Sequence, residues 1–188
     1  MSRPREIRPV DLGVCRGYEY EGDPSHTAIA LPGARLNGMP ALWYAFAPLY
    51  ENGWRVILVW DEFVDRSEDA GDWARRRAKT AAGLAGTVRL LIAKSLTTLA
   101  APLAADFGWP AVWLTPLFDD ETTSALRRRT APALFLGGTA DPLWDGDLAR
   151  ELSPDVLELD GADHGLARID HAQRVADAVA AFSGRLGP

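Results

Sequence analysis

The chain has 188 residues, a net charge of −6 at pH 7 and a pI of about 5.1. This length suits one domain with a substantial core and is too short for two ordinary ones, so we expect residues 1–188 to form a single domain. The acidic balance argues against nucleic acid or an anionic membrane as a partner. With 47% hydrophobic and 24% charged residues, the composition is that of a soluble globular protein and not of a disordered one.

The sequence predicts neither a membrane anchor nor a signal peptide. No uncharged run reaches the roughly 18 residues that a membrane helix needs, and the N-terminus lacks an apolar signal core. The single cysteine, Cys15, excludes an internal disulfide and fits a reducing compartment. We therefore expect a soluble, cytoplasmic protein.

The first half of the chain predicts strands separated by two helices. Residues 13–21 alternate loosely and predict an edge strand, paired with a shorter one near Ile7. Residues 27–31 and 54–60 predict strands. Between them, Pro40 suits a first helical turn, and the helix runs to Asn52-Gly53. A long helix is expected to begin at Ser67, which would act as its N-cap ahead of two acids, and to end at Gly83 or Gly86.

The second half begins with an apolar run, residues 88–94, that predicts a strand buried on both faces. An alanine-rich helix follows and runs to Asp106, with Gly108 as its stop signal. We expect Pro102 to kink this helix. Further strands and helices alternate to the end of the chain. The expected strands are 110–114, 133–137 and 156–159, and the expected helices are 119–129, 143–152 and 166–182.

This alternation predicts an α/β fold with a mostly parallel, doubly wound sheet and helices on both faces. In such a sheet the functional residues gather at the carboxyl ends of the strands. One serine (Ser95), one histidine (His164) and several acids fall at these positions. The segments concerned are 32–35, 61–62, Ser95, 116–120, 139–145 and 161–165.

Ser95, Asp141 and His164 supply the three parts of an activated nucleophile. A serine hydroxyl needs a base to remove its proton, and the base needs an acid that fixes its tautomer and balances its charge. Ser95 lies where a strand turns sharply into a helix, and the three residues come in the chain order Ser, Asp, His. That order, with a strand–serine–helix turn, is typical of the α/β-hydrolase fold.

The chain therefore resembles the α/β-hydrolase superfamily, and in particular a small serine hydrolase without a lid or cap domain. The resemblance extends from residue 27 to residue 182, because 137–142 looks like the acid-bearing turn of that family and 161–165 like its histidine loop. It implies an oxyanion hole made by the backbone N–H groups of Leu96 and Ala34. It implies neither a metal nor an organic cofactor.

The chain departs from the family's G-x-S-x-G motif at the elbow around Ser95. Ala93 and Thr97 stand where the family has glycines, and Thr98 follows. Because threonine is bulkier than glycine and β-branched, we expect a tighter turn or a displaced helix.

Several assignments remain open at this stage. Asp119, Asp120 and Asp145 are rivals of Asp141 for the role of the acid, and Ser95 would, in the simplest alternative, only cap the helix after it. Gly33, Arg35 and Trp144 are candidates for substrate contacts, whereas Trp43, Trp60 and Trp113 are expected in the core. Asp61 and Glu62 are candidates for lining the site or for binding a cation, although no cluster of further ligands supports a metal.

The sequence thus predicts a serine hydrolase that cleaves a small carboxylic ester or thioester through an acyl-enzyme on Ser95. The short connections leave no room for a lid, so the pocket is expected to be shallow and open. The alternative is a hydrolase-like binding or scaffold protein in which Thr97 and Thr98 spoil the elbow. Acyl transfer to an alcohol and perhydrolysis on the same triad are further possibilities. The oligomeric state is not readable from the sequence.

Overall fold

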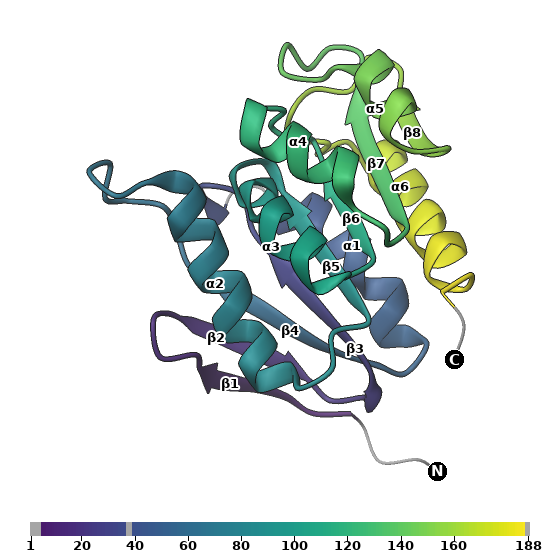
Figure 1. Ribbon diagram of the computed structural model, residues 1–188. Coiled ribbons are helices and arrows are strands. Elements are labelled where there is room, and N and C mark those ends of the chain that lie inside the picture. The colour runs from purple at the N-terminus through teal and green to yellow at the C-terminus, as the bar shows by residue number, and fades with distance from the viewer. Residues whose placement is uncertain (1–4, 37–38, 187–188) are drawn as a thin grey trace.

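The computed structural model describes residues 5–36 and 39–186. These residues fold around one eight-stranded sheet (Figure 1). β4 (Trp54–Trp60) belongs to a run of six strands that pair in parallel, whereas β2 pairs antiparallel with β4 on one side and with β1 on the other. The spatial order is β1-β2-β4-β3-β5-β6-β7-β8. The other strands are β1 (Ile7–Asp11), β2 (Arg16–Tyr20), β3 (Asp23–Leu31), β5 (Leu90–Lys94), β6 (Ala111–Leu114), β7 (Ala133–Gly138) and β8 (Asp155–Leu159).

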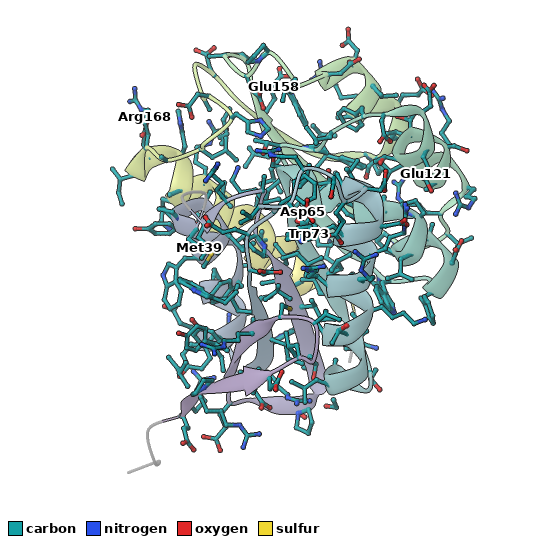
Figure 2. All side chains as sticks on the ribbon, turned by 90° about the vertical axis from the view of Figure 1, so that its left-hand side faces the viewer. Met39, Asp65, Trp73, Glu121, Glu158 and Arg168 are labelled. Atoms are coloured by element: carbon teal, nitrogen blue, oxygen red, sulfur yellow. The ribbon has the colours of Figure 1, made fainter. Side chains whose placement is uncertain are left out.

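Helices cover both faces of this sheet. One face carries α1 (Met39–Glu51) and α6 (Ile169–Ser183), which pack on each other. The other carries α2 (Ala70–Ala85), α3 (Ala101–Phe107) and α4 (Asp120–Arg128), which Figure 1 shows in front of the strands. Figure 2 shows the same layering, with Met39 and Arg168, at the starts of α1 and α6, on one side and Glu121 of α4 on the other. The short helix α5 (Gly146–Leu152) follows β7.

The two-sided cover explains why the parallel strands are continuous apolar runs. In β5, Leu91 and Ala93 pack towards α2 and α3, and Leu90 and Ile92 pack towards α1 and α6. A strand buried on both faces has no solvent side, and its sequence therefore shows no polar alternation. The predicted fold class is confirmed by this architecture.

The strand order reverses between β3 and β5, which are neighbours at the centre of the sheet. The chain leaves β3 for α1 on one face and leaves β5 for α3 on the other. Loops that depart to opposite faces leave a crevice at the carboxyl ends of the two strands, which is where ligands bind in open α/β sheets. Leu31 pairs with Ala93 at this end, so Gly33 and Ser95 follow from adjacent positions.

Several boundaries differ from expectation for local physical reasons. The N-cap of α2 is Asp69, which accepts a hydrogen bond from the Asp72 amide at 2.8 Å, and not Ser67. Pro102 causes no kink, because α3 begins at Ala101 and proline is tolerated in a first helical turn. Helix α6 begins at Ile169 and not at Leu166, because Leu166 has a φ of 52°, which is incompatible with a right-handed helix, and Arg168, the N-cap, is extended.

Two expectations about the N-terminal half were also wrong. The edge strand is β1, whereas β2 lies between β1 and β4. Trp113 is buried as expected, but Trp43 and Trp60 are 40% and 41% exposed. Their rings lie against Tyr20 and Tyr18 of β2.

Candidate active site

Ser95 lies at a strained turn between β5 and a short 3-10 helix, η2 (Ser95–Ala100), that leads into α3. Its φ of 52° is in the left-handed region, which disfavours residues with a Cβ and costs about 1–3 kcal/mol. Such a conformation persists only where the surrounding structure holds it. The hydrogen bonds around the turn are therefore needed to keep Ser95 in this conformation.

Thr97 and Thr98 provide those hydrogen bonds. The Thr97 Oγ1 accepts from the Lys94 amide at 3.1 Å and lies 3.2 Å from the carbonyl oxygen of Leu31, to which it can donate. The Thr98 Oγ1 donates to the Ser95 carbonyl at 2.6 Å and accepts from the Leu117 amide at 3.0 Å. Both threonines are fully buried. The turn continues as the 3-10 helix η2, and the hydroxyls of Thr97 and Thr98 hold it in place.

The side chains of Ser95, His164 and Asp141 meet at the carboxyl ends of β5, β8 and β7. The Ser95 Oγ is 2.7 Å from the His164 Nε2, and the His164 Nδ1 is 2.7 Å from the Asp141 Oδ2. An ionised carboxylate only accepts hydrogen bonds, so the His164 Nδ1 carries the ring hydrogen and is the donor in the hydrogen bond to Asp141. The His164 Nε2 is then free to accept the proton of the serine hydroxyl.

Asp141 is almost completely buried, with its side chain 1% exposed, and its second oxygen also has a donor. The Leu143 amide donates to the Asp141 Oδ1 at 2.9 Å. The loops that carry Asp141 and His164 are joined by a hydrogen bond from the Ala140 amide to the Ala162 carbonyl at 3.0 Å. Both oxygens of the acid and both loops are therefore held before any substrate binds.

The rival acids have other partners. Asp119 and Asp145 cap α4 and α5, where they accept hydrogen bonds from the Thr122 and Leu148 amides. Asp120 is an exposed residue in the first turn of α4. Of the acids considered from the sequence, Asp141 alone is hydrogen-bonded to His164 among the described residues.

A pocket of about 340 Å³ opens beside Ser95, and Ala34 and Gly33 lie in its wall. A Cβ built on Gly33 would be 3.4 Å from the Ser95 Cβ, so the loop after β3 passes directly against the serine. The Leu96 amide belongs to the first turn of η2, where backbone N–H groups have no partner within the helix. Ala34 and Leu96 thus flank Ser95 on the two loops that leave the sheet in opposite directions.

Glu62 and Phe63 hold the loop that carries Ala34. The Leu36 amide donates to the Glu62 Oε1 at 2.9 Å, and the Phe63 amide donates to the Ala34 carbonyl at 2.9 Å. Asp61 instead pairs with Arg77, 2.9 Å away. Neither acid lies in the wall of the pocket.

No known family model and no curated protein matches the chain in sequence. Solved structures match it along nearly its whole length. The esterase domain of a Rhodothermus marinus protein has a TM-score of 0.73 at 14% identity, with 97% of this chain and 100% of that chain covered. An α/β serine hydrolase without a lid from Xanthomonas campestris has a TM-score of 0.66 at 15% identity, over 97% and 96% of the two chains. The dienelactone hydrolase of Anabaena variabilis has a TM-score of 0.71 at 17% identity, over 95% of each chain.

The chain has the α/β-hydrolase fold. The resemblance stated from the sequence is confirmed at this level, including the missing cap domain, because β6 ends at Leu114 and α4 already begins at Asp120. At identities of this order the likeness shows the fold alone.

Two of the three candidates for substrate contacts lie in the wall of the pocket beside Ser95. Gly33 and Arg35 do so, and Arg35 is exposed. Trp144 does not belong to the described wall of this pocket. Its indole donates to the Glu158 carboxylate at 2.7 Å and packs over Gly137, where a Cβ would be 2.0 Å from the ring. Trp144 therefore supports β7 and lies in a neighbouring depression.

Lys94 is the residue of this site that the sequence analysis missed. It lines the pocket, yet it is only 2% exposed, and burial lowers the pKa of its ammonium to about 8 against the partly compensating attraction of Asp141 and Asp163. A signal was present in the sequence, because Lys94 is the one charged residue of a strand otherwise made of buried apolar residues.

Neither a metal cluster nor a membrane helix is found in residues 5–36 and 39–186. No group of three or more His, Cys, Asp or Glu side chains in these ranges is arranged to hold a metal ion. None of the helices there combines the length and apolarity that crossing a bilayer requires.

Proposed function

We propose that this protein is a serine hydrolase that cleaves a carboxylic ester or thioester through an acyl-enzyme on Ser95. The proposal rests above all on the hydrogen-bonded series from the Ser95 Oγ to the His164 Nε2 and from the His164 Nδ1 to the Asp141 Oδ2, both distances being 2.7 Å. A serine bonded in this way to an oriented base is the arrangement that nucleophilic acyl transfer needs.

In the first half of the reaction the Ser95 Oγ attacks the carbonyl carbon while its proton moves to the His164 Nε2. Asp141 balances the positive charge that develops on the imidazole. The carbonyl oxygen becomes an oxyanion and accepts hydrogen bonds from the Leu96 and Ala34 amides, each worth roughly 10²–10³ in rate in enzymes where such a donor has been removed. The bond to the leaving group then breaks, and the leaving alkoxide or thiolate takes the proton from Nε2.

In the second half a water molecule replaces the leaving group. His164 takes a proton from the water, whose oxygen bonds to the acyl carbon, and the bond between that carbon and the Ser95 Oγ breaks. The proton on Nε2 returns to Oγ. The products are a carboxylic acid and the free serine, so the cycle needs neither a metal nor an organic cofactor.

The pocket favours small acyl groups, and Arg35 favours a polar or acidic group on them. The pocket volume of about 340 Å³ lies at the lower end of the range for small-molecule sites. The described part of its wall includes no aspartate or glutamate, and no hydrogen bond or ion pair of the Arg35 guanidinium is present in the described structure. A guanidinium that pairs with none of the described residues suits a carboxylate.

A fluorophosphonate probe tests the reaction directly. The wild-type protein should be labelled, and Ser95→Ala should not, whereas Ser67→Ala, which changes an exposed serine in the loop before α2, should be labelled like wild type. A folded wild type that stays unlabelled would favour the scaffold alternative. Product analysis with hydrogen peroxide or an alcohol present would distinguish hydrolysis from perhydrolysis and acyl transfer.

A pair of 4-nitrophenyl esters tests the substrate preference. The hemisuccinate carries a free carboxylate, and the pentanoate is a neutral ester of similar length. We expect Arg35→Gln to lower kcat/KM for the hemisuccinate about tenfold and to leave the pentanoate nearly unchanged. Arg174→Gln, which alters an exposed arginine on α6, serves as the matched control. Equal losses for both esters in Arg35→Gln would contradict the proposed role of Arg35.

A further inference from the structure

Lys94 connects the strand that carries the nucleophile to the loop that carries the base. Its Nζ donates to the backbone carbonyl of His164 at 2.8 Å and to the Thr115 Oγ1 at 3.1 Å. Lys94 ends β5, Thr115 follows β6 directly, and His164 lies after β8. One ammonium group therefore joins three segments that the chain brings to the same edge of the sheet.

Position 94 is energetically unfavourable for a lysine, because the ammonium group is buried there. The four preceding residues of β5 are apolar and fully buried, and an apolar side chain at position 94 would avoid the desolvation of an ammonium group. The depression of the Lys94 pKa to about 8 reflects that desolvation. Two acceptors and the carboxylates of Asp141 and Asp163 offset only part of it.

The two anchors of Lys94 differ in how firmly the fold holds them. Thr115 is fully buried, and its amide donates to the Leu136 carbonyl at 2.7 Å, so it continues the pairing of β6 with β7. His164 lies in a loop between β8 and α6, next to the exposed Asp163. The two hydrogen bonds of Lys94 thus connect the loop of His164 to the sheet. They do so at the residue whose imidazole must reach Ser95.

We propose that Lys94 is a positioning residue that holds the backbone of His164 at the distance from β5 at which the imidazole meets the Ser95 hydroxyl. This inference rests on the proposed function for its effect on catalysis, but the contact itself can be tested without substrate. Because Ser95 directly follows Lys94, a bond from the Lys94 side chain to the His164 carbonyl fixes the two backbone segments relative to each other. Misplacement by about 1 Å is enough to lower a rate roughly a hundredfold.

Three variants separate the possible roles. Lys94→Met removes the donor and the charge with little change in length, and Lys94→Gln removes the charge but keeps an N–H donor. Lys79→Met, which changes the only other lysine of the sequence and lies exposed on α2, is the matched control. We expect kcat to fall about ten- to hundredfold in Lys94→Met with KM nearly unchanged, to fall less in Lys94→Gln, and to stay at the wild-type value in Lys79→Met.

A measurement without substrate completes the test. In proton NMR spectra, the far-downfield resonance of the His164 Nδ1–H bonded to Asp141 should shift or broaden in Lys94→Met and stay in place in Lys79→Met. A folded Lys94→Met with wild-type kcat and an unchanged resonance would overturn the inference. An unlabelled wild type whose resonance still depends on Lys94 would overturn the proposed function and leave this positioning role supported.

Discussion

At the scale of single residues, Thr97 stands at the second glycine of the family motif, and its hydroxyl and that of Thr98 hold the elbow. Thr97 and Thr98 are bulkier than glycine, but each one bonds to the backbone groups that the turn around Ser95 would leave without partners. The hydroxyl groups therefore stabilise a serine whose own φ of 52° is unfavourable. The scaffold alternative assumed that these threonines spoil the elbow, and their hydrogen bonds argue against that assumption.

Thr97→Val tests this interpretation. Valine has the shape of threonine, so packing is kept, but the buried Lys94 amide loses its acceptor. A buried donor without a partner costs about 1–3 kcal/mol, and we expect the free energy of unfolding to fall by that amount in chemical denaturation. Thr80→Val, on the outer part of α2, should change it by no more than about 0.5 kcal/mol. Equal stability of the two variants would contradict the role given to Thr97.

Asp141→Asn tests the assignment of the acid. The amide is nearly isosteric, but it can donate a hydrogen to the imidazole, which favours the wrong tautomer of His164. We expect kcat for a small 4-nitrophenyl ester to fall about 10⁴-fold, as in the well-studied triads of other enzymes. Asp145→Asn is the control, since asparagine caps a helix about as well as aspartate does. A small loss in Asp141→Asn and a large one in Asp145→Asn would reverse the assignment.

At the scale of elements, the site depends on the close packing of the β7 end against the histidine loop. A Cβ built on Gly138 would be 2.2 Å from the Ala162 carbonyl oxygen, so only glycine lets these two backbones approach. The Ala140 amide bonds to that same carbonyl. This contact sets the loop of Asp141 against the loop of His164 and couples packing to catalysis.

Gly138→Ala should therefore lower both stability and activity. We expect it to lower the free energy of unfolding by at least about 1–3 kcal/mol, as overpacking in a core does, and to reduce kcat. Gly83→Ala is the matched change, because Gly83 lies inside α2 with no atom within 4 Å of its missing Cβ. That variant should be more stable by about 0.5–1 kcal/mol with unchanged kcat. Unfolding curves and ester kinetics for both variants would show whether the site or the substitution type decides the outcome.

At the scale of the whole molecule, Lys94 makes stability depend on pH. Burial lowers its pKa from the ordinary lysine value of 10.5, which we take for the unfolded chain, to about 8 in the folded one, so between these values unfolding takes up a proton. The free energy of unfolding then rises with pH across this window, by roughly 3 kcal/mol in total. Cys15 acts in the opposite direction above pH 9, because burial raises its pKa to about 11 and the folded chain keeps its proton longer.

A comparison of variants isolates the part that belongs to Lys94. Lys94→Met cannot titrate at this position, whereas Cys15 contributes equally to both proteins. The stability of Lys94→Met relative to wild type should thus be greatest near pH 7 and decrease as the pH rises through 8 towards 10.5. Guanidinium unfolding at several pH values between 7 and 10 measures this difference. A difference that stays constant over that range would show that the Lys94 ammonium is not destabilised by burial.

Much of the fold followed from local pattern. Strand β4 has the predicted bounds, and Gly86 and Gly108 end α2 and α3 with positive φ values, because these features depend on neighbouring residues alone. The errors lie where distant segments decide. Trp43 and Trp60 are exposed although their rings contact Tyr20 and Tyr18 of β2, and β1 is the edge of the sheet because β2 also pairs with β4.

The sequence by itself determined the alternation of strands and helices and the strand ends at which Ser95, Asp141 and His164 lie, since apolar periodicity and turn residues act over a few positions. Only the tertiary structure decided the 2.7 Å contacts among these side chains, the separation of Asp141 from its rivals and the burial of Lys94. Distances of this kind depend on which strands become neighbours. That choice minimises exposed apolar surface over the whole chain, so no single segment encodes it.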